Sequence, residues 1–176
     1  MTRRLAHASS VLQHYFHRWK LQVNIHKTEA ILFTRRRPTL PAPLLFQNIQ
    51  IPWKPHICYL GLLLDHKLLF TRHLINVTHT ANDTLVKLFP LLARDSTLSA
   101  QNKLILYKLC IRSILTYAAP VWSSTSVSNY HRLQVLQSKC LRVIGHLPKR
   151  TPIPQLHTIC NSPNSRTHPS YDCPLF

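Results

Sequence analysis

The feature that most constrains this chain is a pair of short strand patterns that flank a polar turn and end in a cluster of arginines. Apolar residues alternate over residues 20–25, which is typical of a short strand. A polar turn at His26 and Lys27 follows, and residues 29–34 are again rich in apolar side chains. We therefore expect a lysine on a turn with a cationic cluster close behind it. The cluster consists of Arg35, Arg36 and Arg37.

The composition points to a polyanionic partner. The 176 residues include 22 Lys and Arg but only 5 Asp and Glu, which gives a net charge of +17. Phosphates bind such a chain because their neutralisation releases condensed counterions. Nucleic acid is the first expectation and an anionic membrane surface the second, while an ordinary basic surface is the least specific alternative. Only 2 glycines are present, which excludes a glycine-rich phosphate-binding loop.

The cysteines and the N-terminal segment predict an intracellular protein that is not secreted. The 5 cysteines are scattered and odd in number, without a secretory signal, so we expect reduced thiols. The basic first residues also suit a mitochondrial transit peptide. We favour a folded helix over residues 4–19, because apolar residues recur there at spacings of three and four. No run reaches the roughly eighteen apolar residues of a membrane-spanning helix, so no membrane partner is expected.

The remaining patterns predict an α+β fold. A small antiparallel sheet should accompany the N-terminal helix, with residues 49–51 and 57–64 forming a hairpin joined through residues 52–55. A helical bundle should follow, and the Pro- and Ser-rich segment after Pro148 should be a poorly ordered tail. The helices are expected from Phe70 to Leu92, from a cap at Ser96 to Pro120, and from Asn129 to Ile144.

The acidic residues argue against a metal centre. Two-metal phosphoryl transfer needs several carboxylates that converge within a few ångströms. Because no two of the acids are neighbours in the sequence, we expect no complete metal site within this chain. They are Glu29, Asp65, Asp83, Asp95 and Asp172.

Lys27 is the best candidate for a role in chemistry. A lysine on a turn can neutralise phosphate charge or donate a proton to a leaving group, although solvated turn lysines are common. The arginines at 35–37 are expected to contact a phosphate backbone, and their alternative is a solvated strand end.

The predicted helices carry many cations interleaved with aromatic residues. Such faces suit a surface that follows a nucleic-acid backbone without reading its sequence. Each cation alone is an ordinary surface charge, so only the set supports binding. The set comprises Lys87, Arg94, Lys103, Lys108, Arg112, Arg132, Lys139 and Arg142.

The tail offers a second kind of site. Cys160, His168 and Cys173, with His157, supply four nitrogen and sulfur donors of the kind that bind zinc. The chain has 12 histidines and 5 cysteines, so such spacings also arise by chance.

An ordered series of motifs resembles the reverse transcriptase of a non-LTR (LINE-type) retrotransposon, most similar to the jockey-like group. Residues 19–34 resemble the fourth motif of the polymerase palm. The segment Tyr59-Leu60-Gly61, with Asp65, resembles the fifth motif. Residues 102–122 and 133–144 resemble two helices of the thumb. The similarity covers roughly residues 5–160.

This resemblance implies a fragment of an RNA-directed DNA polymerase. It assigns residues 1–68 to the end of the palm, 69–147 to a helical thumb, and 148–176 to a tail. Lys27 would lie near the phosphates of the incoming nucleotide, and residues 59–61 would grip the primer end.

The family's metal-binding aspartates would precede Met1, so no cofactor is expected on this chain, whereas the complete polymerase would use Mg²⁺. The implied partners are an RNA template, a DNA primer and the missing fingers and palm, and the implied location is the nucleus. Two alternatives remain: a small basic nucleic-acid-binding module without catalysis, and a retroelement relic without function.

Overall fold

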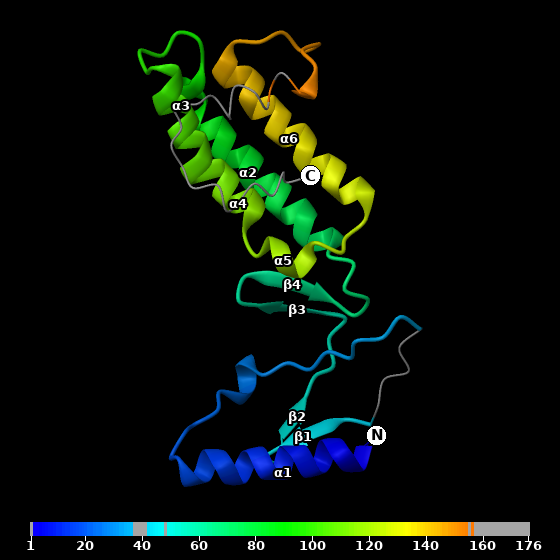
Figure 1. Cartoon of the computed structure of the whole chain (residues 1–176). Helices are drawn as coiled ribbons and strands as arrows, with labels where there is room; N and C mark the ends of the chain where they lie inside the picture. Colours follow the sequence, from blue (N-terminus) through cyan, green and yellow to red (C-terminus); the bar gives the residue numbers. More distant parts are fainter. Residues whose placement is uncertain (1, 37–41, 48, 155, 157–176) are drawn as a thin grey trace. The chain divides into compact units, whose positions relative to one another are not determined.

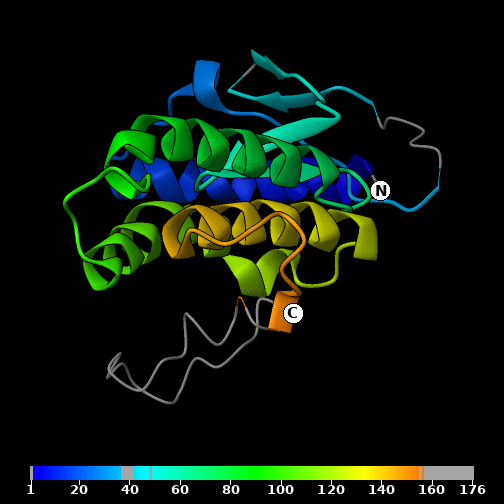
Figure 2. The ribbon, with the colours of Figure 1, turned by 90° about the horizontal axis from the view of Figure 1, so that it is seen from above.

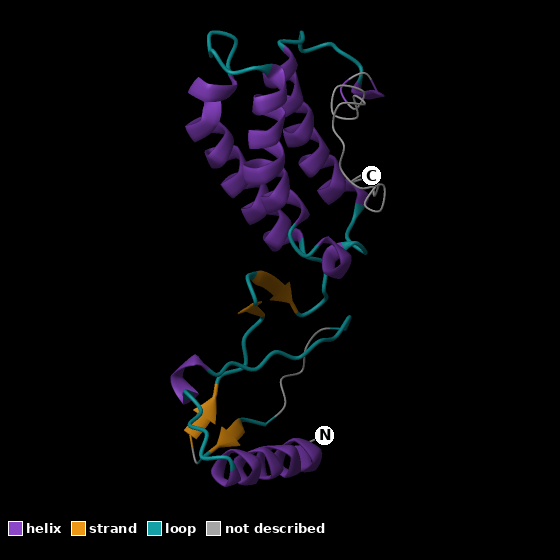
Figure 3. Ribbon diagram, turned by 60° about the vertical axis from the view of Figure 1, so that its left-hand side comes forward, coloured by secondary structure: helices purple, strands orange, loops and turns teal. Residues whose placement is uncertain are grey.

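The computed structural model describes residues 2–36, 42–47, 49–154 and 156, and it divides into two compact units (Figure 1). The first unit is Met1–Leu68 and the second is Leu69–Phe176. The described strands all belong to the first unit, whereas the described part of the second unit is helical (Figure 3). The predicted α+β class, with a small antiparallel sheet, an N-terminal helix and a helical bundle, is therefore confirmed.

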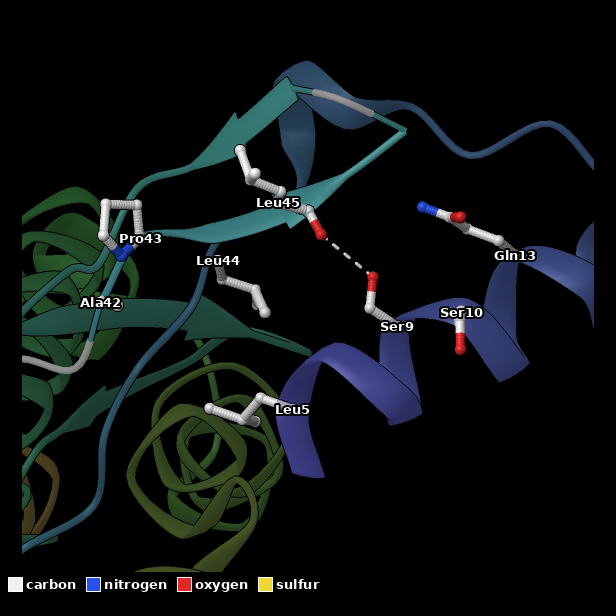
Figure 4. Close-up of a pocket in the computed structure, with 8 residues that line it drawn as sticks. All are labelled: Leu5, Ser9, Ser10, Gln13, Ala42, Pro43, Leu44 and Leu45. Atoms are coloured by element: carbon white, nitrogen blue, oxygen red, sulfur yellow. Dashed lines mark hydrogen bonds between the residues drawn. The ribbon is translucent and has the colours of Figure 1, made fainter. Parts of the chain in front are cut away.

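The first unit is built on helix α1 (Thr2–Arg18), as its apolar periodicity predicts. One face of α1 packs on strand β1 (Leu44–Phe46), which pairs antiparallel with β2 (Ile49–Ile51). The Ser9 hydroxyl donates a hydrogen bond of 3.0 Å to the carbonyl oxygen of Leu45 (Figure 4). Phe46 and Ile51 are buried beneath this contact and form a small core with Ala30.

The strands predicted over residues 20–25 and 29–34 are wrong. Residues Ile25–Lys27 form a turn of 3₁₀ helix, η1, because the Asn24 side chain caps it by accepting the Lys27 N–H at 3.2 Å. Residues 29–34 form no strand: Ala30 makes an isolated parallel bridge to Trp53, and the Thr34 N–H bonds the His66 carbonyl oxygen at 2.9 Å. Pro52 precedes Trp53 and Pro55 follows it by two residues, and a proline has no N–H to extend a ladder, so no sheet grows from this bridge.

The predicted hairpin between residues 49–51 and 57–64 is also wrong. Residues 57–64 are not one strand but a hairpin of β3 (His56–Tyr59) and β4 (Leu62–Asp65). Leu60 and Gly61 form its turn with φ of 48° and 79°. Positive φ at both central residues is the requirement of the type I′ turn, one of the two tight turns that match strand twist. The continuous apolar run concealed this turn.

The second unit contains α2 (Thr71–Leu92), α3 (Ala100–Leu106), the π-helix η2 (Tyr107–Arg112), α4 (Ser113–Thr116), α5 (Ala119–Trp122) and α6 (Val127–Gly145). The first and third predicted helices, α2 and α6, are confirmed. Helices α2 and α6 lie side by side (Figures 1 and 2). The fully buried side chains between the helices include Leu74, Leu85, Ile111, Leu133 and Ile144. Each such side chain stabilises the unit by about 1.5–3 kcal/mol.

The limits predicted for the middle helix are wrong at both ends. Ser99, not Ser96, caps α3, because its hydroxyl accepts the Asn102 N–H at 3.3 Å. At the other end α4 stops at Thr116, and Ala118 takes a left-handed conformation with φ of 50°. Pro120 then lies in the first turn of α5, where its missing N–H costs nothing, so it begins a helix instead of ending one.

The π-helix has a physical cause in the spacing of the buried residues. Lys103, Tyr107, Ile111 and Leu115 are all buried and follow one another at intervals of four. In an α-helix each four-residue step overshoots one full turn by about 40°, so such a series would drift off the core face. The wider turn of the π segment absorbs that drift and keeps all four positions inward.

The predicted tail, residues 148–176, lies mostly outside the described residues, which end at Leu156. Within the described part, Thr151 and Leu156 are buried. None of the described helices has the length and apolar character that crossing a bilayer requires.

Candidate nucleic-acid interface

The helical unit carries a large excess of positive charge. Between residues 69 and 156 there are eleven Lys and Arg but only two acids, Asp83 and Asp95. Helix α6 contains no acid at all. The cations are unevenly buried, so they cannot all contact a ligand in the same way. Those with exposed side chains are Arg72, Lys87, Arg94, Arg132, Lys139, Lys149 and Arg150.

Lys139 and Arg132 lie on the exposed surface of α6. The Lys139 Nζ donates a hydrogen bond of 3.0 Å to Oδ1 of Asn82, which lies on α2. This contact places Lys139 on the side of α6 that borders α2. Arg132 precedes Lys139 by seven residues, about two helical turns, so it lies on the same side. Together these two cations form the α6 basic edge, which lies next to α2.

Arg142 and Arg112, also predicted contacts, are half-buried. The Arg142 Nη2 donates a hydrogen bond of 3.2 Å to the Thr151 carbonyl oxygen, so this guanidinium holds the chain that returns after α6. Arg112 ends the π-helix, and its carbonyl oxygen accepts the Thr116 hydroxyl at 2.9 Å. Both residues are less available to a phosphate than the α6 basic edge.

Lys103 has a structural position that differs from the prediction. Its side chain is only 2% exposed, and its Nζ donates a 2.6 Å hydrogen bond to the carbonyl oxygen of Ala93. In this position the ammonium lies against the end of α2 and not on the solvent-facing surface. Lys103 is therefore left out of the candidate interface.

In the first unit, the predicted residues lie on exposed loops. Lys27 is exposed at the end of η1. Arg35 and Arg36 are exposed on a bend, where the Arg36 N–H bonds the Thr34 hydroxyl at 3.2 Å. Arg37 lies outside the described residues.

The Tyr59-Leu60-Gly61 segment forms the tip of the β3–β4 hairpin. Tyr59 and Leu60 are 60% and 72% exposed. Positive φ at Leu60 and Gly61 sets the turn, and the two large apolar side chains at this tip are exposed to solvent.

The carboxylates do not assemble into a metal site in the described part of the chain, where no three His, Cys, Asp or Glu side chains come close enough to hold an ion. Glu29 pairs with Lys54, and Asp83 pairs with His79 at 3.0 Å. Asp65 accepts the Lys67 N–H at 3.2 Å. The carboxylates of the described residues therefore form no cluster of the kind that holds Mg²⁺. The possible zinc donors from His157 to Cys173 lie outside the described residues.

Among the described residues of the helical unit, two groups have shifted pKa values, and both shifts come from burial. Burial lowers the pKa of His73, because the charged imidazolium loses its hydration. Burial raises the pKa of the Cys140 thiol to about 12, against the opposing charge of Lys139. A thiol held protonated in this way belongs to the core and is not a nucleophile.

A pocket in the first unit has no chemical character that would suit phosphate. It lies between α1 and residues 42–45, with a volume of about 250 Å³ (Figure 4). Its polar lining side chains are Ser9, Ser10 and Gln13, and none of the described residues that line it is charged.

Sequence reasoning missed Arg72, Lys149 and Arg150, which are also exposed. Only their charge signals them, because each lies at or beyond the end of a helix and outside its periodic pattern. It also missed Asn82, which orients Lys139, since an amide on a polar helix face carries no signal of its partner.

Fold and surface together define a basic α+β protein whose described residues expose cations on helices and assemble no metal site. Over 127 residues the chain is 32% identical to the probable RNA-directed DNA polymerase from transposon X-element of Drosophila melanogaster. It is 33% identical over 132 residues to that from transposon BS of the same species. It is 28% identical over 151 residues to the RNA-directed DNA polymerase from mobile element jockey of Drosophila funebris.

These three matches cover 72%, 74% and 82% of the chain but only 14%, 15% and 16% of the relatives. The chain therefore spans about one seventh of the length of the curated relatives it matches. No family model matches the chain. No solved structure matches it either. The chain is a relative of the RNA-directed DNA polymerases of jockey-like, non-LTR transposons and corresponds to a part of them.

Proposed function

We propose that the chain is the part of a retrotransposon RNA-directed DNA polymerase that holds the RNA template and DNA primer, and that it does not synthesise DNA alone. Residues 1–68 would be the end of the palm and 69–147 the thumb. The names of the relatives support polymerase ancestry. The observation that best supports a role in binding is the α6 basic edge, Arg132 and Lys139. It lies on a helical unit whose described residues include few acids.

The proposed contact is to the phosphate backbone. Arg132 and Lys139 are spaced by two turns of one helix, so both can reach phosphates along one groove edge. Such contacts fix the orientation of a duplex and carry no sequence information. A polymerase needs this property because it must hold every sequence that it copies.

The first unit would contribute accessory contacts. Exposed Lys27 would lie near the incoming nucleotide, and the exposed hairpin tip at residues 59–61 would touch the primer end. Arg35, Arg36 and Arg37 would add positive charge along the primer strand. These assignments follow the family resemblance, and the exposure of Lys27, Tyr59 and Leu60 is compatible with them.

The proposal that this chain does not synthesise DNA alone depends on its carboxylates. Each of Glu29, Asp65 and Asp83 has a local partner, and two-metal transfer needs carboxylates that converge on the ions. We expect no nucleotide incorporation when the purified chain is given a primed RNA template, Mg²⁺ and all four dNTPs. Incorporation above that of a mock purification would refute this part.

The binding part is tested with a fluorescent RNA–DNA hybrid titrated at several KCl concentrations. The variant Arg132→Gln with Lys139→Gln removes the α6 basic edge. Its matched control is Lys20→Gln with Lys67→Gln, which removes two exposed cations from the first unit.

Affinity of the unmodified chain should fall steeply with salt. The α6 variant should reduce the slope of log K against log [KCl] by about 1.8, because each phosphate contact contributes about 0.9. The control should change the slope much less. Equal effects from both variants, or a binding constant that does not respond to salt, would overturn the proposed interface.

A further inference from the structure

Helix α2 carries an exposed pair of a histidine and an aspartate. The Nδ1 atom of His79 lies 3.0 Å from Oδ2 of Asp83, which follows it by one helical turn. The two side chains are 79% and 51% exposed. Asp83 is also the only acidic residue in the sequences of α2 and α6. The net charge of this pair therefore decides whether any negative charge accompanies the cations of these two helices.

The direction of α2 and α6 places the pair beside the α6 basic edge. The two helices lie side by side and run the same way (Figure 2). Near their starts Asn129 bonds Thr71 at 3.2 Å, and further along Lys139 bonds Asn82 at 3.0 Å. His79 precedes Asn82 by three residues, or about 4.5 Å along the helix axis. It is therefore level with the stretch of α6 between the two cations of the basic edge.

Around the axis of α2, the pair lies next to the amide that bonds Lys139. At about 100° per residue, His79 lies about 60° from Asn82, and Asp83 lies about 40° further in the same direction. A helix with its side chains is about 10–12 Å across, so the pair lies within roughly that distance of the Lys139 Nζ. Because the Debye length is about 10 Å in 0.1 M salt, the charge of the pair acts on a phosphate bound at this edge.

The other charged groups around the pair are cations. Lysine and arginine keep their charge between pH 6 and pH 8, so they add a constant attraction for phosphate. Besides α6, the elements η2 and α4 pack on α2, and residues 100–116 include no acid and no histidine. The cations are Arg72 and Lys87 on α2, Arg132 and Lys139 on α6, and Lys103, Lys108 and Arg112 on the elements between them.

The remaining described histidines of the helical unit differ from His79. His73 is buried on α2, and its lowered pKa disfavours the charged form. His131 and His146 are exposed on α6 and at its C-cap, with no acid between residues 127 and 146. His79 is thus the histidine of this unit whose protonation cancels a negative charge.

We propose that the His79–Asp83 pair makes the affinity of the α6 basic edge for a phosphate backbone depend on pH. At pH 8 a neutral imidazole leaves the Asp83 carboxylate to repel the phosphates. At pH 6 a protonated imidazole cancels that charge, and binding is stronger. Histidine is the side chain that ordinarily changes its charge between these values. The inference rests on the proposed function, because it concerns the same site and the same ligand.

The experiment titrates the fluorescent RNA–DNA hybrid with the full chain at low KCl concentration, at pH 6 and at pH 8. His79→Gln leaves Asp83 uncompensated at both values, and Asp83→Asn removes the negative charge. The matched controls are His14→Gln, an exposed histidine on the acid-free helix α1, and Asp95→Asn, an exposed aspartate in the turn after α2. All four substitutions are at exposed positions, and circular dichroism checks that the helices are kept.

The two test variants should differ from the unmodified chain at opposite ends of the pH range. His79→Gln should bind like the unmodified chain at pH 8 and about two- to fourfold more weakly at pH 6, the effect of one charge at this distance. Asp83→Asn should bind about two- to fourfold more tightly at pH 8 and reach the affinity that the unmodified chain has at pH 6. Each control should change the ratio of the two affinities much less.

Proton uptake gives a second readout. A ligand that binds the protonated form more tightly must raise the affinity of the protein for the proton by the same factor. Calorimetry near pH 7 in two buffers of different ionisation enthalpy should therefore detect protons taken up when the hybrid binds. His79→Gln should lower this uptake, and His14→Gln should leave it unchanged.

The outcomes separate this inference from the proposed function. The pH dependence is wrong if His79→Gln keeps the affinity ratio of the unmodified chain, or if Asp95→Asn strengthens binding at pH 8 as much as Asp83→Asn. When the double variant of Arg132 and Lys139 still reduces the salt slope, such a result removes only the inference. A salt slope that the double variant does not reduce would overturn the interface and the inference together.

Discussion

Lys103 and Ala93 are joined by a hydrogen bond of 2.6 Å from the lysine Nζ to the alanine carbonyl oxygen. Ala93 is the C-cap of α2, and its own N–H bonds the carbonyl oxygen of Phe89 at 2.8 Å. A cation at this end of a helix compensates the partial negative charge of the last carbonyls. The bond therefore ties the start of α3 to the end of α2.

Replacing this lysine should destabilise the helical unit. Lys103→Met keeps the apolar stem but leaves the carbonyl of the half-buried Ala93 without its donor, which costs about 1–3 kcal/mol. A loss of 1 kcal/mol lowers Tm by roughly 4–8 °C in a unit of this size. Thermal unfolding by circular dichroism measures the effect, and Lys87→Met is the exposed control. An unchanged Tm together with weaker nucleic-acid binding would instead make Lys103 a surface contact.

The β3–β4 turn should respond in opposite directions to two substitutions. Leu60→Asn should stabilise the hairpin, since asparagine tolerates positive φ better than leucine, by about 0.5–1 kcal/mol. Gly61→Val should destabilise it by at least about 1–2 kcal/mol. Urea unfolding measures both, with Leu21→Asn as an exposed control. If Leu60→Asn destabilises the protein, the leucine side chain makes a contact that outweighs its backbone strain.

The helical unit should lose stability in mild acid because of His73. Its folded-state pKa lies below the ordinary value of 6.5, so the unfolded state binds more protons as the pH falls. The stability is complete above about pH 6.5 and declines below it until the folded-state pKa is reached. His73→Leu should flatten the dependence of Tm on pH between 7.5 and 5, whereas the exposed control His79→Gln should not. A parallel decline in both variants would assign the effect to other groups.

Asn129 should be essential to the contact between the starts of α6 and α2. Its Nδ2 donates to the hydroxyls of Thr71, at 3.2 Å, and Thr125, at 2.9 Å. The Thr125 hydroxyl in turn donates to the Leu69 carbonyl oxygen at 2.8 Å. Asn129→Leu keeps the volume but removes both donors, and we expect a loss of about 1–3 kcal/mol. Chemical denaturation checks this, and Asn76→Leu on the exposed side of α2 should have little effect.

The helices could be predicted from sequence because their apolar residues recur with a regular period. In α2, Leu74, Ala81, Leu85 and Leu92 keep one face inward, and all four are buried. The strands could not be predicted in the same way. Short strands depend on turns, and the turn at Leu60-Gly61 carries no polar residue to mark it, so the sequence pattern predicts one strand where the structure has two.

The candidate site was only partly predictable for a related reason. Charge alone identifies Arg132 and Lys139, which are exposed, but it identifies Lys103 equally. Lys103 is distinguished by the carbonyl of Ala93, ten residues earlier, and that partner exists only once α2 has ended and α3 has turned back. The roles assigned to the remaining predicted contacts stay predictions.

The π-helix has a consequence for the tolerance of this protein to changes in chain length. Lys103, Tyr107, Ile111 and Leu115 would recur at intervals of four, three and four if one residue between Tyr107 and Ile111 were deleted, which is the heptad-like spacing of a regular helix. Leu109, at 68% exposure, is the residue whose deletion removes the least packing. A chain shortened by Leu109 should therefore still fold, and its circular dichroism and hydrogen exchange should show an uninterrupted helix, so this stretch tolerates the loss of one residue.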